Sequence, residues 1–143
     1  MTDEPYNLHR FVDAQNPVFE DVRAELRSGK KESHWMWFIF PQIAGLGNSR
    51  TAQHYAISSL AEAEAYLRHP ILGRRLRECT VLTLSIESDS AEEIFGFPDF
   101  LKFRSCMTLF SCATSESKLF ISALEKYFGG EPDSLTLQRL SKS

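Results

Sequence analysis

Apolar residues recur along most of this chain at the three- and four-residue spacing of a helix face. Over residues 17–28 this spacing is carried by Val18, Phe19, Val22 and Leu26. A longer stripe over residues 70–86 predicts the longest helix, which we expect to be central in the fold. This periodicity is typical of helices that pack one face against a core and leave the other in water.

Helix-start residues divide the chain into short segments. Ser59 and Ser90 are each followed three residues later by glutamate, which is the capping-box signature. Further helix starts are expected at Asn7, Asn16, Ser33, Ser49, Pro70, Pro98, Ser115 and either Asp133 or Ser134. No linker, internal repeat or low-complexity segment interrupts residues 1–143. The sequence therefore predicts a single all-α domain, a compact bundle of about seven or eight short-to-medium helices with flexible first and last few residues.

The densest apolar block is HWMWFIFPQ, residues 34–42, which contains both tryptophans. As a strand, Trp35–Phe40 would be apolar on both faces and would need a covered sheet, but no second strand-like run is present to pair with it. A short buried helix that starts at Ser33 and ends before Pro41 fits better. We therefore favour helix over strand for this block.

Composition indicates an ordinary globular domain with an aromatic-rich core. Hydrophobic residues make up 43% of the 143 positions, and eleven phenylalanines are more than this size requires. Cys79, Cys106 and Cys112 form no CxxC pair and lie on predicted helices, so we expect buried free thiols. The acidic N-terminus lacks an export signal, and no apolar run is long enough to span a bilayer. We expect a cytoplasmic protein without a membrane partner.

Charge argues against one class of partner and points to another. The net charge of −3 argues against nucleic acid, because phosphate backbones are bound by basic faces. The local exception is a group of arginines around one helix start: Arg68, Arg74, Arg75 and Arg77. Guanidinium groups suit phosphate or carboxylate, so this group predicts an anion patch; a solvated or salt-bridged surface is the alternative.

A glycine turn, GLGNSR over residues 45–50, follows the aromatic block and leads to the helix start at Ser49. Free backbone N–H groups at a helix start bind anions, so the turn is a candidate ligand loop; a plain tight turn with a cap is the alternative. The third glycine and the preceding strand of a dinucleotide fingerprint are both missing, which excludes a Rossmann site.

These features predict a ligand site in which a tryptophan stacks on a planar ring and an arginine binds a phosphate. The candidate ligand-binding residues are Trp35, Trp37, Gln42, Gly45, Gly47, Ser49, Arg50 and Arg74. For proton transfer the candidates are His34, Asp99 and Lys102, but no catalytic signature accompanies them, so the sequence assigns no reaction. No histidine pair has metal-ligand spacing, and we expect neither a metal nor a cofactor.

Four segments together resemble a known family. They are HWMWFIFPQ, GLGNS, AEAEAYLRHPILGRRL and IFGFPDFLKFRSCMTLF. Over roughly Leu8 to Leu140 the chain is similar to a bacterial family of unknown function whose members are often mislabelled "calpastatin" in genomes. The resemblance implies a compact, multihelical cytosolic domain, and it supplies neither a reaction nor catalytic residues.

Two functions follow from the sequence. The first is a helical domain that binds a small anionic ligand, nucleotide-like or phosphate-bearing, and it requires Arg50, Arg74 and the tryptophans to share one pocket. The alternative is a protein–protein interaction module or a homodimer without catalytic activity, which docks through exposed aromatic or leucine side chains. We rank the first slightly ahead of the second.

Overall fold

The structure is a computed structural model that describes residues 5–142, and all regular secondary structure within that range is helical. The helices are α1 (His9–Gln15), α2 (Phe19–Ser28), α3 (Met36–Ile39), α4 (Arg50–His54), α5 (Leu60–Arg68), α6 (Leu72–Leu84), α7 (Ala91–Phe95), α8 (Asp99–Cys112), α9 (Lys118–Phe128) and α10 (Ser134–Ser141). The all-α prediction is confirmed. The expected number of seven or eight is wrong, because the short segments α3, α4 and α7 bring the helices of the described residues to ten. The predicted flexibility at the two ends concerns positions 1–4 and 143, which lie outside the described residues.

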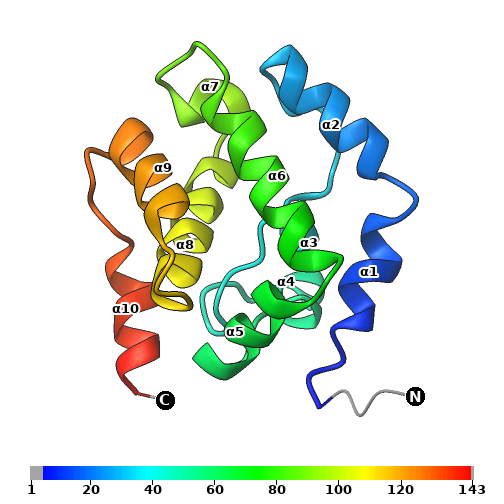
Figure 1. Cartoon of the computed structure of the whole chain (residues 1–143), viewed down its shortest axis with the longest axis vertical. Coiled ribbons are helices and arrows are strands. Elements are labelled where there is room, and N and C mark those ends of the chain that lie inside the picture. Colours follow the sequence, from blue (N-terminus) through cyan, green and yellow to red (C-terminus); the bar gives the residue numbers. More distant parts are fainter. Residues whose placement is uncertain (1–4, 143) are drawn as a thin grey trace.

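Helix α6 crosses the middle of the molecule, with α1 and α2 on one side and α8, α9 and α10 on the other (Figure 1). It packs against α2, α5 and α9, as a central helix does. However, α8 has 14 residues and α6 has 13, so the prediction that residues 70–86 form the longest helix is wrong. The reason is that residues 69–71 form the turn before α6, which therefore begins only at Leu72. Within residues 5–142, no helix is long and apolar enough to cross a membrane.

The aromatic block lies in the core as helix α3. The prediction of helix rather than strand is confirmed for Met36–Ile39, with Trp35 and Phe40 at its two ends. The ring of Phe40 contacts those of Phe95 and Phe103 edge to face, with centroids 5.8 and 5.0 Å apart. Buried rings of this kind supply a large share of the favourable free energy of folding.

A buried amide connects four helices beside this block. Gln15 of α1 is only 1% exposed, and its Nε2 donates to the Phe38 carbonyl at 2.7 Å and to Tyr66 Oη at 3.1 Å. Its Oε1 accepts from Arg75 Nη1 at 3.2 Å. Because a buried amide is costly unless its polar atoms are paired, these bonds fix α1 against α3, α5 and α6.

Some of the predicted helix-start residues cap a helix and others do not. As predicted, backbone N–H groups at the starts of α4, α5, α7 and α10 donate to the side chains of Ser49, Ser59, Ser90 and Asp133. The starts expected at Asn7, Asn16, Ser33 and Ser115 are wrong. Two of these side chains serve other partners: Asn16 Oδ1 accepts from Arg75, and Ser33 Oγ donates to Glu25.

Candidate functional site

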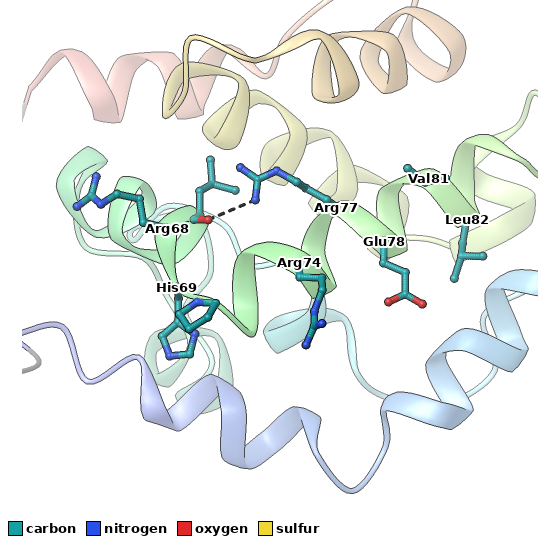
Figure 2. A pocket seen from close by; sticks show the side chains of 9 residues that line it. Arg68, His69, Arg74, Arg77, Glu78, Val81 and Leu82 are labelled. Carbon is teal, nitrogen blue, oxygen red and sulfur yellow. Dashed lines mark hydrogen bonds between the residues drawn. The ribbon is translucent and has the colours of Figure 1, made fainter. Parts of the chain in front are cut away.

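Three of the four clustered arginines line one cavity at the elbow between α5 and α6 (Figure 2). This arginine cavity has a volume of about 650 Å³. Its walls are Leu67, Arg68, His69, Pro70, Arg74, Arg77, Glu78, Val81 and Leu82. The fourth arginine, Arg75, is bound to Gln15 and Asn16 instead. The predicted cluster therefore forms for three of its four members.

Two local features fix the elbow. The imidazole Nδ1 of His69 accepts the backbone N–H groups of Ile71 at 3.1 Å and Leu72 at 3.3 Å, so it caps the start of α6. Gly73 then allows the two helices to approach closely, since a Cβ at this position would lie 2.1 Å from the Leu67 carbonyl oxygen. In the sequence, the only sign of this close approach is a glycine inside an otherwise helical pattern.

Positive charge in the arginine cavity is only partly compensated. Arg77 donates to a backbone carbonyl of α5 at 3.3 Å. By contrast, Arg68 and Arg74 are exposed and form no side-chain hydrogen bond or ion pair with the described residues. The acid in the wall, Glu78, is paired with Arg23 at 2.7 Å. Figure 2 shows the guanidinium groups of Arg77 and Arg74 on opposite sides of α6, so these two groups do not point toward one another.

The tryptophans lie away from this cavity. Trp35 is 1% exposed and its Nε1 donates to Glu25 at 2.9 Å, so its ring offers no face to a ligand, contrary to the prediction. Trp37 is half-buried, and the ammonium of Lys102 lies 5.1 Å from its ring centroid. Neither tryptophan lines the arginine cavity. The structure therefore does not bring the tryptophans and Arg74 into one pocket.

A second cavity gathers several of the other predicted residues. It has a volume of about 370 Å³, and we call it the α8–α10 groove. Its walls are Gln42, Leu46, Gly47, Pro98, Leu101, Lys102, Ser105, Asp133 and Leu135. Lys102 and Ser105 both line the groove from α8, and Lys102 pairs with Asp99 at 3.3 Å. A second ammonium, that of Lys31, lies 2.9 Å from the same carboxylate.

Almost the whole chain matches the model of a known protein family. Residues 5–140 match the family described as "Protein of unknown function (DUF1810)". The chain belongs to the DUF1810 family. Among solved structures it is similar to the conserved hypothetical protein Rv1873 from Mycobacterium tuberculosis, known from a crystal structure. The two are 53% identical with a TM-score of 0.95, and the match covers 96% of this chain and 99% of that one. No curated protein matches the chain.

In the DUF1810 chain the glycine turn is contacted by the last helix. Gly45 has a φ of +97°, and its carbonyl accepts from Arg139 Nη2 of α10 at 3.2 Å. Ser49 caps α4, and Arg50 and His34 are exposed side chains that lie outside both cavities. Sequence reasoning missed Arg139, because 94 residues separate it from Gly45 and no local signal joins them.

The DUF1810 chain offers no activated buried thiol. Cys79 and Cys106 are buried as predicted, and burial raises the pKa of Cys79 to about 12 and holds the pKa of Cys106 well above its usual value. Because the thiolate is the nucleophile, both are inert at neutral pH. Cys112 is exposed, so its predicted burial is wrong; it is the last residue of α8. Among the described side chains, no group of three or more His, Cys, Asp or Glu could hold a metal ion.

Proposed function

We propose that this protein is a cytoplasmic binding domain that takes a small phosphate-bearing ligand in the arginine cavity. The observation that carries the proposal is that Arg68 and Arg74, without partners among the described residues, line the same cavity as Arg77. The acid there is already paired, so the cavity is cationic in a chain of net charge −3. Its volume of about 650 Å³ is of the size that small-ligand sites have.

The walls of the arginine cavity favour one kind of group for the part of the ligand that carries the phosphate. Leu67, Pro70, Val81 and Leu82 supply aliphatic surface, and the lining contains no Phe, Tyr or Trp; its one aromatic ring is the imidazole of His69. A nucleobase would therefore lack the stacking partner that the sequence analysis expected from a tryptophan. Arginine forks bind phosphate oxygens in pairs, so a phosphate ester with a non-aromatic body fits these walls better than a nucleotide.

The test is a thermal-shift and calorimetric titration at low salt in a phosphate-free buffer. The ligands are inorganic phosphate, glycerol phosphate, hexose phosphates and AMP. A ligand at a hundred times its Kd stabilises the fold by about 2.7 kcal/mol, which raises Tm by several degrees. We expect Arg74→Ala and Arg68→Ala to remove this shift.

The matched control is Arg50→Ala, which removes the same charge from an exposed helical arginine outside the cavity. It should leave the shift unchanged. If Arg50→Ala weakens binding as much as Arg74→Ala, the attraction is general and the proposal is wrong. The absence of a shift with every phosphate also refutes it.

A second candidate function is association with a protein partner or a second copy of the chain. It is favoured by Phe97, which is 73% exposed beside Pro98, and by Leu101 and Leu135, which are also exposed at the groove. Apolar surface of this kind is common at interfaces. A solution mass that rises with protein concentration and returns to monomer in Phe97→Ser would support association. A constant monomer mass would exclude the homodimer.

A further inference from the structure

The walls of the α8–α10 groove are aliphatic. Leu46 comes from the loop after α3, Pro98 and Leu101 from the start of α8, and Leu135 from the start of α10. Leu101 and Leu135 are 41% and 56% exposed, so they leave apolar surface in water that a ligand would bury. No aromatic ring lines the groove, which favours a flexible hydrocarbon chain over a planar ring.

The charges at one end of the groove do not cancel. The carboxylate of Asp99 faces two ammonium groups, that of Lys31 at 2.9 Å and that of Lys102 at 3.3 Å. The side chain of Lys31 is only 8% exposed, and its ammonium lies 5.3 Å from the ring of Trp35, so it stays with Asp99. Lys102 is the more exposed of the two lysines and lines the groove. One positive charge is therefore left at this end.

Two further features favour an anion near Lys102. The carboxamide of Gln42 lines the same groove and makes no side-chain hydrogen bond with the described residues, so its N–H groups are free to donate. Pro98, Leu101 and Lys102 also form the N-terminal end of α8, a 14-residue helix whose dipole is positive there. The acid in the wall, Asp133, keeps its negative charge, but it is the N-cap of α10 and lies at the positive end of that helix dipole, where its Oδ2 accepts the N–H of Thr136 at 3.0 Å and the Thr136 hydroxyl at 2.6 Å.

We propose that the α8–α10 groove binds an aliphatic monocarboxylate, with the carboxylate at Lys102 and Gln42 and the hydrocarbon chain on Leu46, Leu101 and Leu135. This site shares no wall residue with the arginine cavity. The carboxylate of the ligand competes with Asp99 for the ammonium of Lys102, so ligand binding draws this ammonium away from the ring of Trp37. Binding is therefore visible in the fluorescence of Trp37.

The experiment uses the full-length chain, sodium octanoate as the ligand, and calorimetry together with tryptophan fluorescence. Octylamine is the matched ligand, since it has the same chain and the opposite charge. Lys102→Met removes the ammonium and keeps the length of the side chain. Lys118→Met is the matched protein variant, because Lys118 is an exposed lysine at the first position of α9, away from the groove.

We expect octanoate to bind the wild-type chain and octylamine not to bind. Lys102→Met should weaken octanoate binding at least tenfold, while Lys118→Met and Arg74→Ala leave it unchanged. Trp37→Phe should remove the fluorescence change and keep the heat of binding. Leu135 is 56% exposed, so Leu135→Ser removes little buried surface, and it should weaken octanoate binding as well.

Several results would overturn the proposal. One is the absence of octanoate binding to the wild-type chain, and another is equal binding of octylamine. Unchanged octanoate affinity in Lys102→Met, with an unchanged melting temperature, excludes the lysine as the carboxylate partner. Loss of binding in Arg74→Ala assigns the carboxylate to the arginine cavity, and protection of Leu135 in a stable dimer assigns the groove to a second copy. Phosphate binding at Arg74 is measured separately, so either site can fail alone.

Discussion

The close approach of α5 and α6 at Gly73 makes a sharp prediction for Gly73→Ala. The new Cβ would lie 2.1 Å from the Leu67 carbonyl oxygen and 2.9 Å from its carbonyl carbon. Ordinary van der Waals contact begins at 3.4 Å, so the oxygen must retreat by about 1.3 Å, the difference between 3.4 and 2.1 Å. Both of these atoms belong to the backbone, so no side-chain rotation relieves the clash.

Three contributions determine how much Gly73→Ala changes the free energy of unfolding. Alanine gains about 1 kcal/mol over glycine in a helix. That gain is offset by about 1 kcal/mol for the hydrogen bond from Arg77 to the displaced Leu67 carbonyl, which is 3.3 Å long in the structure. Forcing the two helices apart costs about 1–3 kcal/mol. We therefore expect Gly73→Ala to lower the free energy of unfolding by about 2 kcal/mol.

Urea denaturation followed by circular dichroism at 222 nm measures this change. Arg74→Ala is the control, since it places the same methyl side chain one residue further along α6 at an exposed position. It should change stability by less than about 0.5 kcal/mol. A Gly73→Ala variant as stable as the wild type, or more stable as helix propensity alone predicts, would refute the close approach.

Three further predictions concern single side chains. Glu62 is buried and pairs with Arg10 at 3.0 Å. Glu62→Ala should therefore lower the free energy of unfolding, measured in urea, by about 3 kcal/mol. This is the low end for a broken buried pair, because Arg10 keeps four carbonyl acceptors; a loss below about 1 kcal/mol would contradict the prediction. Burial raises the pKa of Glu25, but hydrogen bonds from Ser33, from two backbone N–H groups and from the Trp35 indole outweigh it and lower the pKa to about 2. The folded pKa of Glu25 lies below the unfolded value of about 4.5, so its stabilisation of the fold is present above pH 4.5 and is lost as the pH falls towards 2. Glu25→Gln should flatten the dependence of the free energy of unfolding on pH over that window. An unchanged pH dependence in Glu25→Gln would exclude a contribution from Glu25. Finally, Ellman's reagent should label the exposed Cys112 rapidly and the two buried thiols only in denaturant, whereas rapid labelling of all three would contradict their burial.

Helix positions were predictable where the signal is local. Ser59 and Ser90 cap their helices because serine and the N–H that it accepts are three residues apart. Asn16 carries an equally good local signal, but its side chain accepts from Arg75, 59 positions away. A sequence pattern does not show that competition, because it is decided by which helices pack together.

The candidate sites were predictable in part for the same reason. The density of arginines near residue 70 was visible in the sequence, and helical geometry separates Arg74 from Arg75. The groove joins Gln42, Lys102 and Leu135, which are on three separate segments. Gln42 and Lys102 were candidate site residues because of their polar side chains. Leu135, by contrast, looks in the sequence like any other apolar residue of an amphipathic helix. The packing of α10 against α8 is what makes it a wall.

Helix α10 has a consequence for local unfolding. Of its eight residues only Thr136 is fully buried, while Leu135 and Leu137 are 56% and 40% exposed. A helix with so little buried surface opens at a lower free energy than the core helices, so its amide protons should exchange faster than those of α8. Because α10 supplies one wall of the groove and the Arg139 contact to Gly45, each opening also breaks the groove and frees the glycine turn. A ligand bound there would slow amide exchange at the C-terminal end of the chain and in the turn together.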